Sequence, residues 1–181
     1  MVKNSAHSFW RAVNGSLLAA SAAFFLAILP ISLPAIAGKV VVFNGDAARG
    51  TIIVRTRERR LYFVLGRGQA LRYTVGVGRA GRQWAGKSFI VGKHIRPNWA
   101  PPPEIKRDRP KLPDLIPSGS PANPMGAAAL TLAGGEYAIH GTNAPNSIGR
   151  FVSYGCIRMH NKDIIDLYGR VRLGTPVVVM P

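Results

Sequence analysis

The chain has 181 residues, a length that suits one globular domain better than two. Its apolar content of 47% supports a packed core and excludes disorder as the dominant state. The 24 lysines and arginines against 8 aspartates and glutamates give a net charge of +16, which indicates an acidic partner. Nucleic acid, anionic lipid and anionic wall polymer all have that character.

The first 37 residues are ordered like a secretory signal peptide. Lys3 and Arg11 are their only charged side chains, and an apolar block follows over residues 16–31. Ala35-Ile36-Ala37 is a small-x-small pattern, so we expect cleavage before Gly38. The alternative is a retained membrane anchor, because the block is near the lower length of a span, although its prolines disfavour a continuous helix. Both interpretations put the remaining chain in the periplasm or cell envelope, with membrane attachment only if the segment is uncleaved. Nucleic acid is therefore not expected as a partner.

Short β-type segments separated by turns follow the signal segment. Val, Ile, Tyr and Phe are concentrated in them, and Asn44-Gly45 and Gly66-Arg67-Gly68 are strong turn signals. The segment over residues 71–77 alternates apolar and polar side chains, as a half-buried strand does. We expect strands over residues 40–43, 51–56, 60–65, 71–77 and 88–91.

A proline-rich stretch interrupts this pattern. Residues 97–103, PNWAPPP, exclude a regular helix or a central strand, and the chain from there to Pro124 is expected to be a long loop. After it we expect an apolar run over 127–132, strands over 136–140 and 177–179, and a helix over 161–171 with Asn161 as its N-cap. Many short strands with one short late helix indicate an all-β domain, a sandwich or barrel.

Cys156 is the only cysteine, so no intramolecular disulfide can form. In an oxidising compartment a lone thiol is exposed to oxidation, so its presence indicates either a chemical use or burial in the core. His140 lies 16 residues earlier, at the end of an expected strand, and Arg158 adds positive charge two residues later. Because a thiol needs a base or a positive field to become a nucleophile, Cys156 and His140 are the candidate pair.

Glycines complete this constellation. Gly155 lets the backbone turn tightly, so that N–H groups near Cys156 can point at a developing oxyanion. No carboxylate in this stretch is placed to orient the imidazole of His140, so a backbone carbonyl must do so, and Gly141 is the nearest candidate. Taken alone, each of these residues also has an ordinary interpretation as a buried histidine, a surface arginine or a turn glycine.

The other histidines of the chain after residue 37 are weaker candidates. His160 is expected at the start of the late helix, and His94 is isolated among strand and loop residues. The spacing of the cysteine and the histidines matches no zinc-binding pattern, so neither a metal nor another cofactor is expected.

Two segments carry a resemblance to a known family. His140-Gly141-Thr142 and Ser153-Tyr154-Gly155-Cys156-Ile157-Arg158-Met159 resemble the signature of the catalytic domain of L,D-transpeptidases, the YkuD-type domain of the ErfK, YbiS, YcfS and YnhG proteins. Further segments that resemble the family are residues 61–62, 75–78, 97–102, 123–126 and 174–177. The resemblance covers nearly all of residues 38–181, which we expect to form one catalytic domain after a signal peptide at residues 1–37.

The resemblance implies a two-step acyl transfer on peptidoglycan. Cys156 attacks a tetrapeptide stem, expels the terminal D-Ala and forms a thioester, which an amine acceptor then resolves. His140 accepts the thiol proton and later protonates the leaving amine. The resemblance further implies that a β-lactam of the carbapenem class inhibits the enzyme by forming an adduct on Cys156.

The residues around the nucleophile are expected to support this reaction. Backbone N–H groups near Tyr154, Gly155 and Cys156 would hold the oxyanion, and Ser153 and Arg158 would support the loop or bind a stem carboxylate. The acceptor stays open, because wall cross-linking, lipoprotein attachment, D-amino-acid exchange and hydrolysis share the first half-reaction.

This sequence departs from the family pattern at two places. Tyr154 stands where many members have a histidine, which leaves the base to His140 and affects only a supporting role. Residues 83–86, QWAG, stand where many members have a Thr-Pro-x-Gly turn. We expect the second departure to shape the rim of the site and not its chemistry.

Two other functions compete with this interpretation. A sortase or a papain-like wall peptidase matches poorly, because papain-like enzymes place the cysteine before the histidine and sortases place their arginine much further downstream. A catalytically idle, cationic envelope-binding protein would keep the fold without the reaction. The intact set of Cys156, His140 and Arg158 disfavours that alternative.

Overall fold

The computed structural model describes residues 37–135 and 137–181, so the predicted signal segment lies outside the described residues. Within the described part, no helix combines the length and the hydropathy that crossing a membrane requires.

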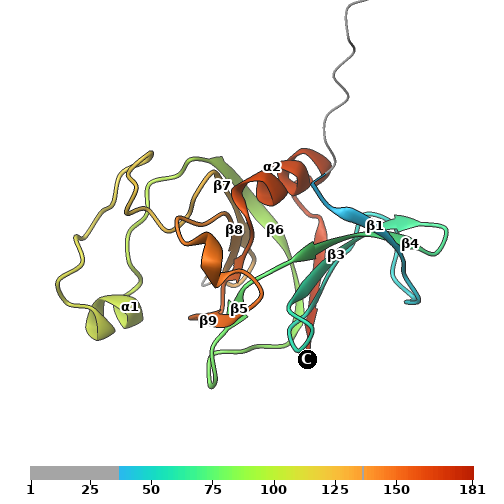
Figure 1. The fold of residues 1–181 in the computed structure, drawn as a ribbon, viewed down its shortest axis with the longest axis horizontal. Helices are drawn as coiled ribbons and strands as arrows, with labels where there is room; N and C mark the ends of the chain where they lie inside the picture. Colours follow the sequence, from blue (N-terminus) through green and yellow to red (C-terminus); the bar gives the residue numbers. More distant parts are fainter. Residues whose placement is uncertain (1–36, 136) are drawn as a thin grey trace, which may run out of the picture. The chain divides into compact units, whose positions relative to one another are not determined.

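Strands dominate the described chain (Figure 1). They are β1 (Lys39–Val42), β2 (Ile52–Arg55), β3 (Arg60–Gly66), β4 (Gln69–Thr74), β5 (Val77–Gly78), β6 (Gly86–Ile95), β7 (Ala128–Leu132), β8 (Ala138–His140), β9 (Phe151–Ser153), β10 (Ile157–Arg158) and β11 (Pro176–Met180). Two α-helices, α1 (Pro103–Asp108) and α2 (Asn161–Arg170), and a 3₁₀ turn, η1 (Pro145–Ser147), complete the elements. The expectation of an all-β domain with one short late helix is confirmed for its strand-rich class and for α2.

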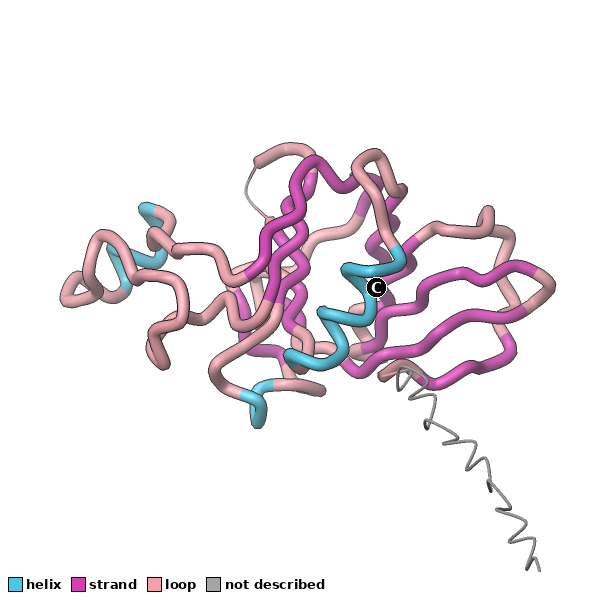
Figure 2. Tube along the Cα trace, turned by 90° about the horizontal axis from the view of Figure 1, so that it is seen from above, coloured by secondary structure: helices cyan, strands magenta, loops and turns pink. Residues whose placement is uncertain are grey.

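The nine-stranded sheet runs in the order β1-β4-β3-β2-β11-β6-β7-β8-β10, while β5 and β9 form a separate parallel pair. The long strand β6 belongs to both halves of the sheet, because its residues 86–89 pair with β11 and its residues 90–95 pair with β7. A register shift between Ile90 and Gly92 lies within the pairing with β7. In the view of Figure 2, α2 runs between the strands of the two halves.

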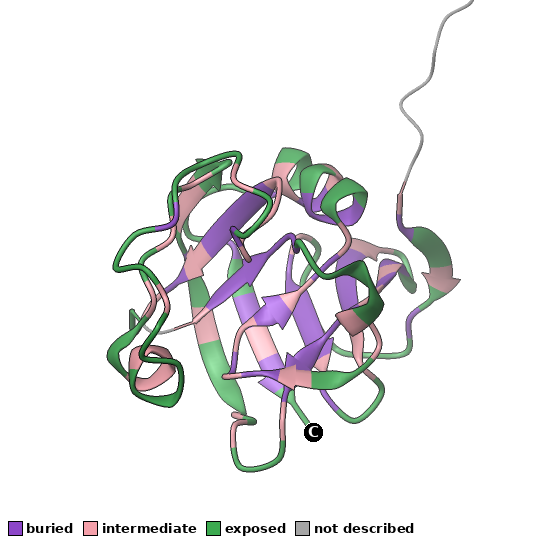
Figure 3. Ribbon diagram, turned by 60° about the vertical axis from the view of Figure 1, so that its left-hand side comes forward, coloured by how far each residue is buried: buried purple, intermediate pink, exposed green. Residues whose placement is uncertain are grey.

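The main core lies between the two halves of the sheet and α2. Val177 and Val179 of β11 point into it, as do Ile164 and Leu167 of α2, and each is at most 2% exposed. The opposite face of α2 is exposed to solvent, so the helix is amphipathic (Figure 3). Packing against this core fixes the positions of β7 and β8, and so of the side chains on their other face.

Two strand predictions differ from the structure in length. The strand predicted over residues 71–77 ends at Thr74, because the residues that follow no longer pair with β3. The N–H of Gly76 donates instead to the carbonyl of Arg158 at 2.9 Å. The strand predicted over residues 88–91 extends over Gly86–Ile95, since it pairs with β11 and then with β7.

The prediction that the chain from Pro97 to Pro124 is only a loop is wrong. Helix α1 occupies Pro103–Asp108 with a proline in its first turn, where the missing N–H needs no partner within the helix. Glu104 in the first turn and the basic Lys106 and Arg107 in the last turn also suit the helix dipole. Prolines thus mark the beginning of a helix here and do not exclude one.

The prediction of Asn161 as the N-cap of the late helix is also wrong. His160 occupies the N-cap position without a side-chain cap, and the helix begins at Asn161 itself. The Oδ1 atom of Asn161 accepts hydrogen bonds from the N–H groups of Ala127 and Thr142, both at 3.0 Å. The side chain therefore joins two loop segments beside His140, whose backbone donors would otherwise have no partner here.

Candidate active site

The parallel pairing of β8 and β10 brings the predicted residues together. Arg158 lies opposite His140, and Ile157 lies opposite Ile139. Because the two isoleucines are at most 1% exposed and face the core, His140 and Arg158 point to the other face of the sheet. Cys156 directly precedes β10 and lies close enough to Arg158 for the guanidinium charge to lower its pKa.

Cross-strand neighbours form a row on this face that runs from Arg158 of β10 through β8 and β7 to β6. His94 of β6 lies opposite Ala129 of β7, and Ala129 lies opposite His140 of β8. Two strand spacings, about 10 Å, therefore separate His94 from His140. His94 is exposed and does not join the Cys156 site.

His140 is held as a neutral imidazole. Its ring is 4% exposed, and Nδ1 lies 2.7 Å from the carbonyl oxygen of Gly141, the residue expected to orient it. Burial, together with the charge of Arg158, lowers the pKa of His140 to about 4, against the opposing effect of the Gly141 and Pro124 carbonyls. With its proton on Nδ1 facing Gly141, the imidazole keeps Nε2 as a proton acceptor.

The thiol of Cys156 is also held in its neutral form. Burial raises the pKa of Cys156, and a hydrogen bond from the Ala138 N–H and the charge of Arg158 offset this only in part. Arg158 is itself half-buried, and its Nε has no hydrogen-bond partner among the described residues. A neutral thiol and a neutral imidazole call for proton transfer during attack and not for a preformed ion pair.

The loop before Cys156 is held by a hydroxyl. The Oγ of Ser153 donates to the carbonyl of Cys156 at 2.6 Å and accepts from the N–H of Gly155 at 3.1 Å. The Gly155 N–H, which we expected at the oxyanion, is thus already bonded. The N–H groups of Tyr154 and Cys156 have no acceptor in residues 37–135 and 137–181, which leaves them as the candidate oxyanion donors.

A cleft of about 480 Å³ opens above the thiol. Its lining combines helix α1 with the Cys156 loop: Pro102, Pro103, Glu104, Ile105, Arg107, Gly135, Tyr137, Tyr154 and Cys156. A nucleophile at the edge of a partly enclosed cleft is the arrangement that covalent catalysis requires.

Tyr154 fastens helix α1 over this cleft. Its hydroxyl donates to Oδ2 of Asp108 at 2.7 Å, and Arg79 donates to the same oxygen at 3.1 Å. The Arg79 guanidinium also lies 4.1 Å from the centre of the Tyr154 ring, and Arg82 pairs with Glu104 at the other end of the helix. Sequence reasoning missed this set, because its members are scattered along the chain.

The comparison with known families agrees with the geometry of this site. A family model described as the YkuD L,D-transpeptidase catalytic domain matches residues 49–179. This chain belongs to the YkuD family of L,D-transpeptidase catalytic domains. Among curated relatives, the Escherichia coli proteins named "Probable L,D-transpeptidase ErfK/SrfK" and "Probable L,D-transpeptidase YbiS" are 39% and 37% identical over 144 and 141 residues. These alignments cover 75% and 73% of this chain, which spans a little under half, 45%, of each relative.

Solved structures of L,D-transpeptidases have the same fold as this YkuD-type domain. An L,D-transpeptidase from Mycobacterium smegmatis superposes with a TM-score of 0.58 at 15% identity, over 72% of this chain and 58% of that one. The catalytic domain of the E. faecium L,D-transpeptidase acylated by ertapenem gives a TM-score of 0.56 at 19% identity, over 75% of this chain and all of that one.

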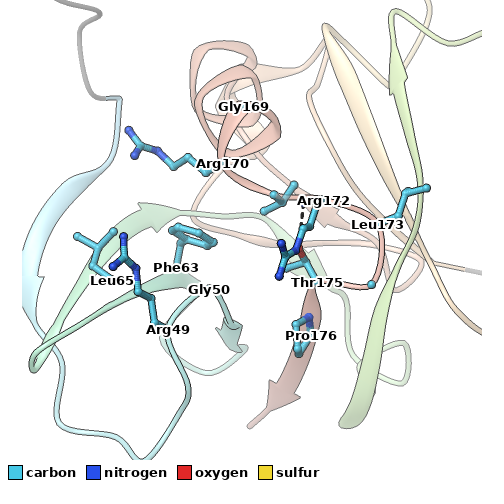
Figure 4. Close-up of a pocket in the computed structure, with 12 residues that line it drawn as sticks. Arg49, Gly50, Phe63, Leu65, Gly169, Arg170, Arg172, Leu173, Thr175 and Pro176 are labelled. Carbon is cyan, nitrogen blue, oxygen red and sulfur yellow. Dashed lines mark hydrogen bonds between the residues drawn. The ribbon is translucent and has the colours of Figure 1, made fainter.

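A cavity of about 890 Å³ lies elsewhere in this YkuD-type domain (Figure 4). Arg49, Arg170 and Arg172 line it with apolar side chains such as Phe63 and Leu65, and no predicted site residue does. His160 lines a third cavity with Lys39 and Arg72, so the structure does not bring it to Cys156. Among the described residues there is no group of three or more His, Cys, Asp or Glu side chains that could hold a metal.

Proposed function

We propose that this protein is an exported L,D-transpeptidase that acts on peptidoglycan stem peptides through a thioester on Cys156. The family and the named relatives support the reaction class. The observation that carries the assignment to these residues is the pairing of β8 with β10, which sets His140 beside Arg158, whose charge lowers the pKa of Cys156.

The first half-reaction makes a thioester. As Sγ of Cys156 attacks the carbonyl carbon at the L-centre of a tetrapeptide stem, Nε2 of His140 accepts the thiol proton. The carbonyl oxygen becomes an oxyanion and takes hydrogen bonds from the free N–H groups of the Cys156 loop. The tetrahedral intermediate then breaks its C–N bond, and the imidazolium of His140 gives its proton to the departing amine of D-Ala.

The second half-reaction restores the thiol. An acceptor amine attacks the thioester carbonyl, His140 accepts the amine proton, and the C–S bond breaks as Cys156 leaves and is reprotonated. Arg158 supports this sequence through its guanidinium, whose Nε has no partner among the described residues and can donate to a carboxylate or carbonyl oxygen of the stem. The cycle needs no cofactor.

Inhibition by β-lactams belongs to the same proposal. Two solved L,D-transpeptidases with this fold are described with carbapenems: one is acylated by ertapenem, and the other is in complex with imipenem. We expect a carbapenem to open its lactam ring on Cys156, because the ring carbonyl presents the same acyl carbon as a stem peptide.

The cysteine is tested by replacement. Cys156→Ser should abolish turnover of a tetrapeptide stem and the mass increase on incubation with a carbapenem, because a hydroxyl lacks thiolate reactivity. Circular dichroism and thermal unfolding of the variant should match the wild type. A wild-type protein that folds and yet forms no adduct and turns over no stem would instead support an idle, envelope-binding role.

Export is a separate part of the proposal and rests on the sequence of residues 1–37. Protein isolated from the envelope fraction should begin at or near Gly38 by N-terminal sequencing. If protein in that fraction still begins at Met1, the segment is not cleaved and the membrane-anchor alternative is correct.

A further inference from the structure

Trp84 makes a hydrogen bond to the backbone next to the nucleophile. Its Nε1 donates to the carbonyl oxygen of Gly155 at 3.0 Å, across 71 positions of sequence. The indole also stacks on the Tyr137 ring, with centroids 5.1 Å apart and planes 9° from parallel. Two contacts thus direct the indole N–H at one peptide group.

Gly155 leaves that peptide group without a side chain to anchor it. A Cβ atom at this position would lie 2.2 Å from Cε1 of Tyr137, so the approach of the ring requires glycine. The backbone at Gly155 has a φ of +125°, which side chains rarely allow. Glycine is conformationally free, so the orientation of the peptide that follows depends on its hydrogen bonds.

The geometry of a trans peptide links this carbonyl to the oxyanion. The carbonyl of Gly155 and the N–H of Cys156 belong to one planar unit and point in opposite directions, and no described peptide bond is cis. When Trp84 holds the carbonyl, it turns the Cys156 N–H away from the indole. The Ser153 hydroxyl holds the next carbonyl, that of Cys156, so both peptides flanking the nucleophile are anchored.

We propose that Trp84 is a positioning residue that orients the Cys156 N–H as an oxyanion donor. This inference rests on the proposed function, in which Cys156 attacks an acyl carbon. The hydrogen bond to the Gly155 carbonyl also polarises the shared peptide, which strengthens the N–H as a donor. Residues 83–86 therefore act on the chemistry as well as on the rim.

The test separates acylation from thiol reactivity. Trp84→Phe keeps an aromatic ring against Tyr137 and removes the donor. Single-turnover acylation of Cys156 by a carbapenem should fall about 10- to 100-fold, because it develops an oxyanion. Alkylation of Cys156 by iodoacetamide forms no oxyanion and should stay within about twofold, since the environment of the thiol is unchanged. Trp99→Phe is the matched control, and both of its rates should equal those of the wild type.

A second variant keeps the test decisive if Trp84→Phe is unstable. Trp84→His retains a ring N–H with less stacking area, and it should acylate faster than Trp84→Phe even if its melting temperature is lower. The proposal is overturned if acylation is unchanged in Trp84→Phe, if both rates fall together, or if Trp84→His is the slower variant. Failure of the proposed function has a different signature: the wild type would alkylate and never acylate.

Discussion

His140 combines a buried position with the ability to accept a proton. The Gly141 carbonyl holds Nδ1, and burial with the Arg158 charge keeps the ring neutral down to about pH 4. A neutral imidazole is the form that a general base needs before attack. The same environment makes the imidazolium unfavourable once formed, so it readily returns the proton to the leaving amine.

Replacement of the histidines should single out one of them. His140→Ala should slow single-turnover acylation of Cys156 by about two to four orders of magnitude, the usual contribution of a positioned base. His160→Ala and His94→Ala should change the rate far less, because one residue lines another cavity and the other lies two strands away. A collapse in His160→Ala with an active His140→Ala would mean that the base is misassigned.

The buried imidazole also makes stability depend on pH. The unfolded chain binds a proton at His140 near pH 6.5, whereas the folded protein binds it only near pH 4. The unfolded state therefore holds more protons in this window, and stability decreases as the pH falls through it. Relative to His140→Gln, the wild type should lose up to about 3 kcal/mol of unfolding free energy between neutral pH and pH 4. Urea unfolding at a series of pH values measures this, and parallel curves for the two proteins would contradict it.

At the scale of elements, α1 illustrates how a short helix is held by its neighbours. Six residues are too few for a stable isolated helix, and none of its residues is buried. Its position therefore depends on polar contacts, chiefly Tyr154 and Arg79 with Asp108, and Arg82 with Glu104. These contacts set the width of the cleft over Cys156.

Loss of one hydroxyl should loosen this helix without unfolding the domain. Tyr154→Phe removes the hydrogen bond to Asp108, and amide exchange over residues 103–109 should become several-fold faster. The melting temperature should barely change, because exposed polar contacts of this kind contribute about 1 kcal/mol or less. Tyr168→Phe is the control, since its hydroxyl has no hydrogen bond to the described residues. Unchanged exchange in Tyr154→Phe would show that the hydroxyl does not hold α1.

At the scale of the whole molecule, the positive charge is only partly neutralised. The ion pairs of the described residues occupy Glu58, Glu104, Asp108, Asp114 and Asp166. Arg170 pairs with Asp166, but Arg49 and Arg172, which line the same large cavity, have no such partner among the described residues (Figure 4). An arginine-lined surface apart from Cys156 suits an anionic wall polymer.

Binding to purified wall material should depend on this surface. The double variant Arg49→Ala, Arg172→Ala should bind sacculi about three- to tenfold more weakly at low salt, a change of roughly 1 kcal/mol. High salt should weaken the wild type and reduce the difference. Arg57→Ala, Arg150→Ala loses the same charge elsewhere, and co-sedimentation of both double variants separates a local effect from net charge. Equal losses would mean that only net charge matters.

Much of the fold was accessible from local sequence. Runs of β-branched and aromatic residues with turn signals predict most strands, because strand pairing buries such side chains wherever they occur. The constellation of His140, Cys156 and Arg158 was accessible too, since each lies in a short segment with a distinctive order. The prolines before and at the start of α1 indicate a loop, but tertiary contacts outweigh this local preference.

The amino-acid sequence by itself determined the strand-rich class of this protein, its family and the identity of the candidate nucleophile and base. Only the tertiary structure decided which backbone donors at Cys156 lack an acceptor among the described residues, that Asn161 joins two loops and caps no helix, and that Trp84 and Tyr154 form hydrogen bonds around the site. The physical reason is distance along the chain. Strand and turn preferences act between neighbours, whereas the hydrogen bonds made by Asn161, Tyr154 and Trp84 join residues 19 to 71 positions apart.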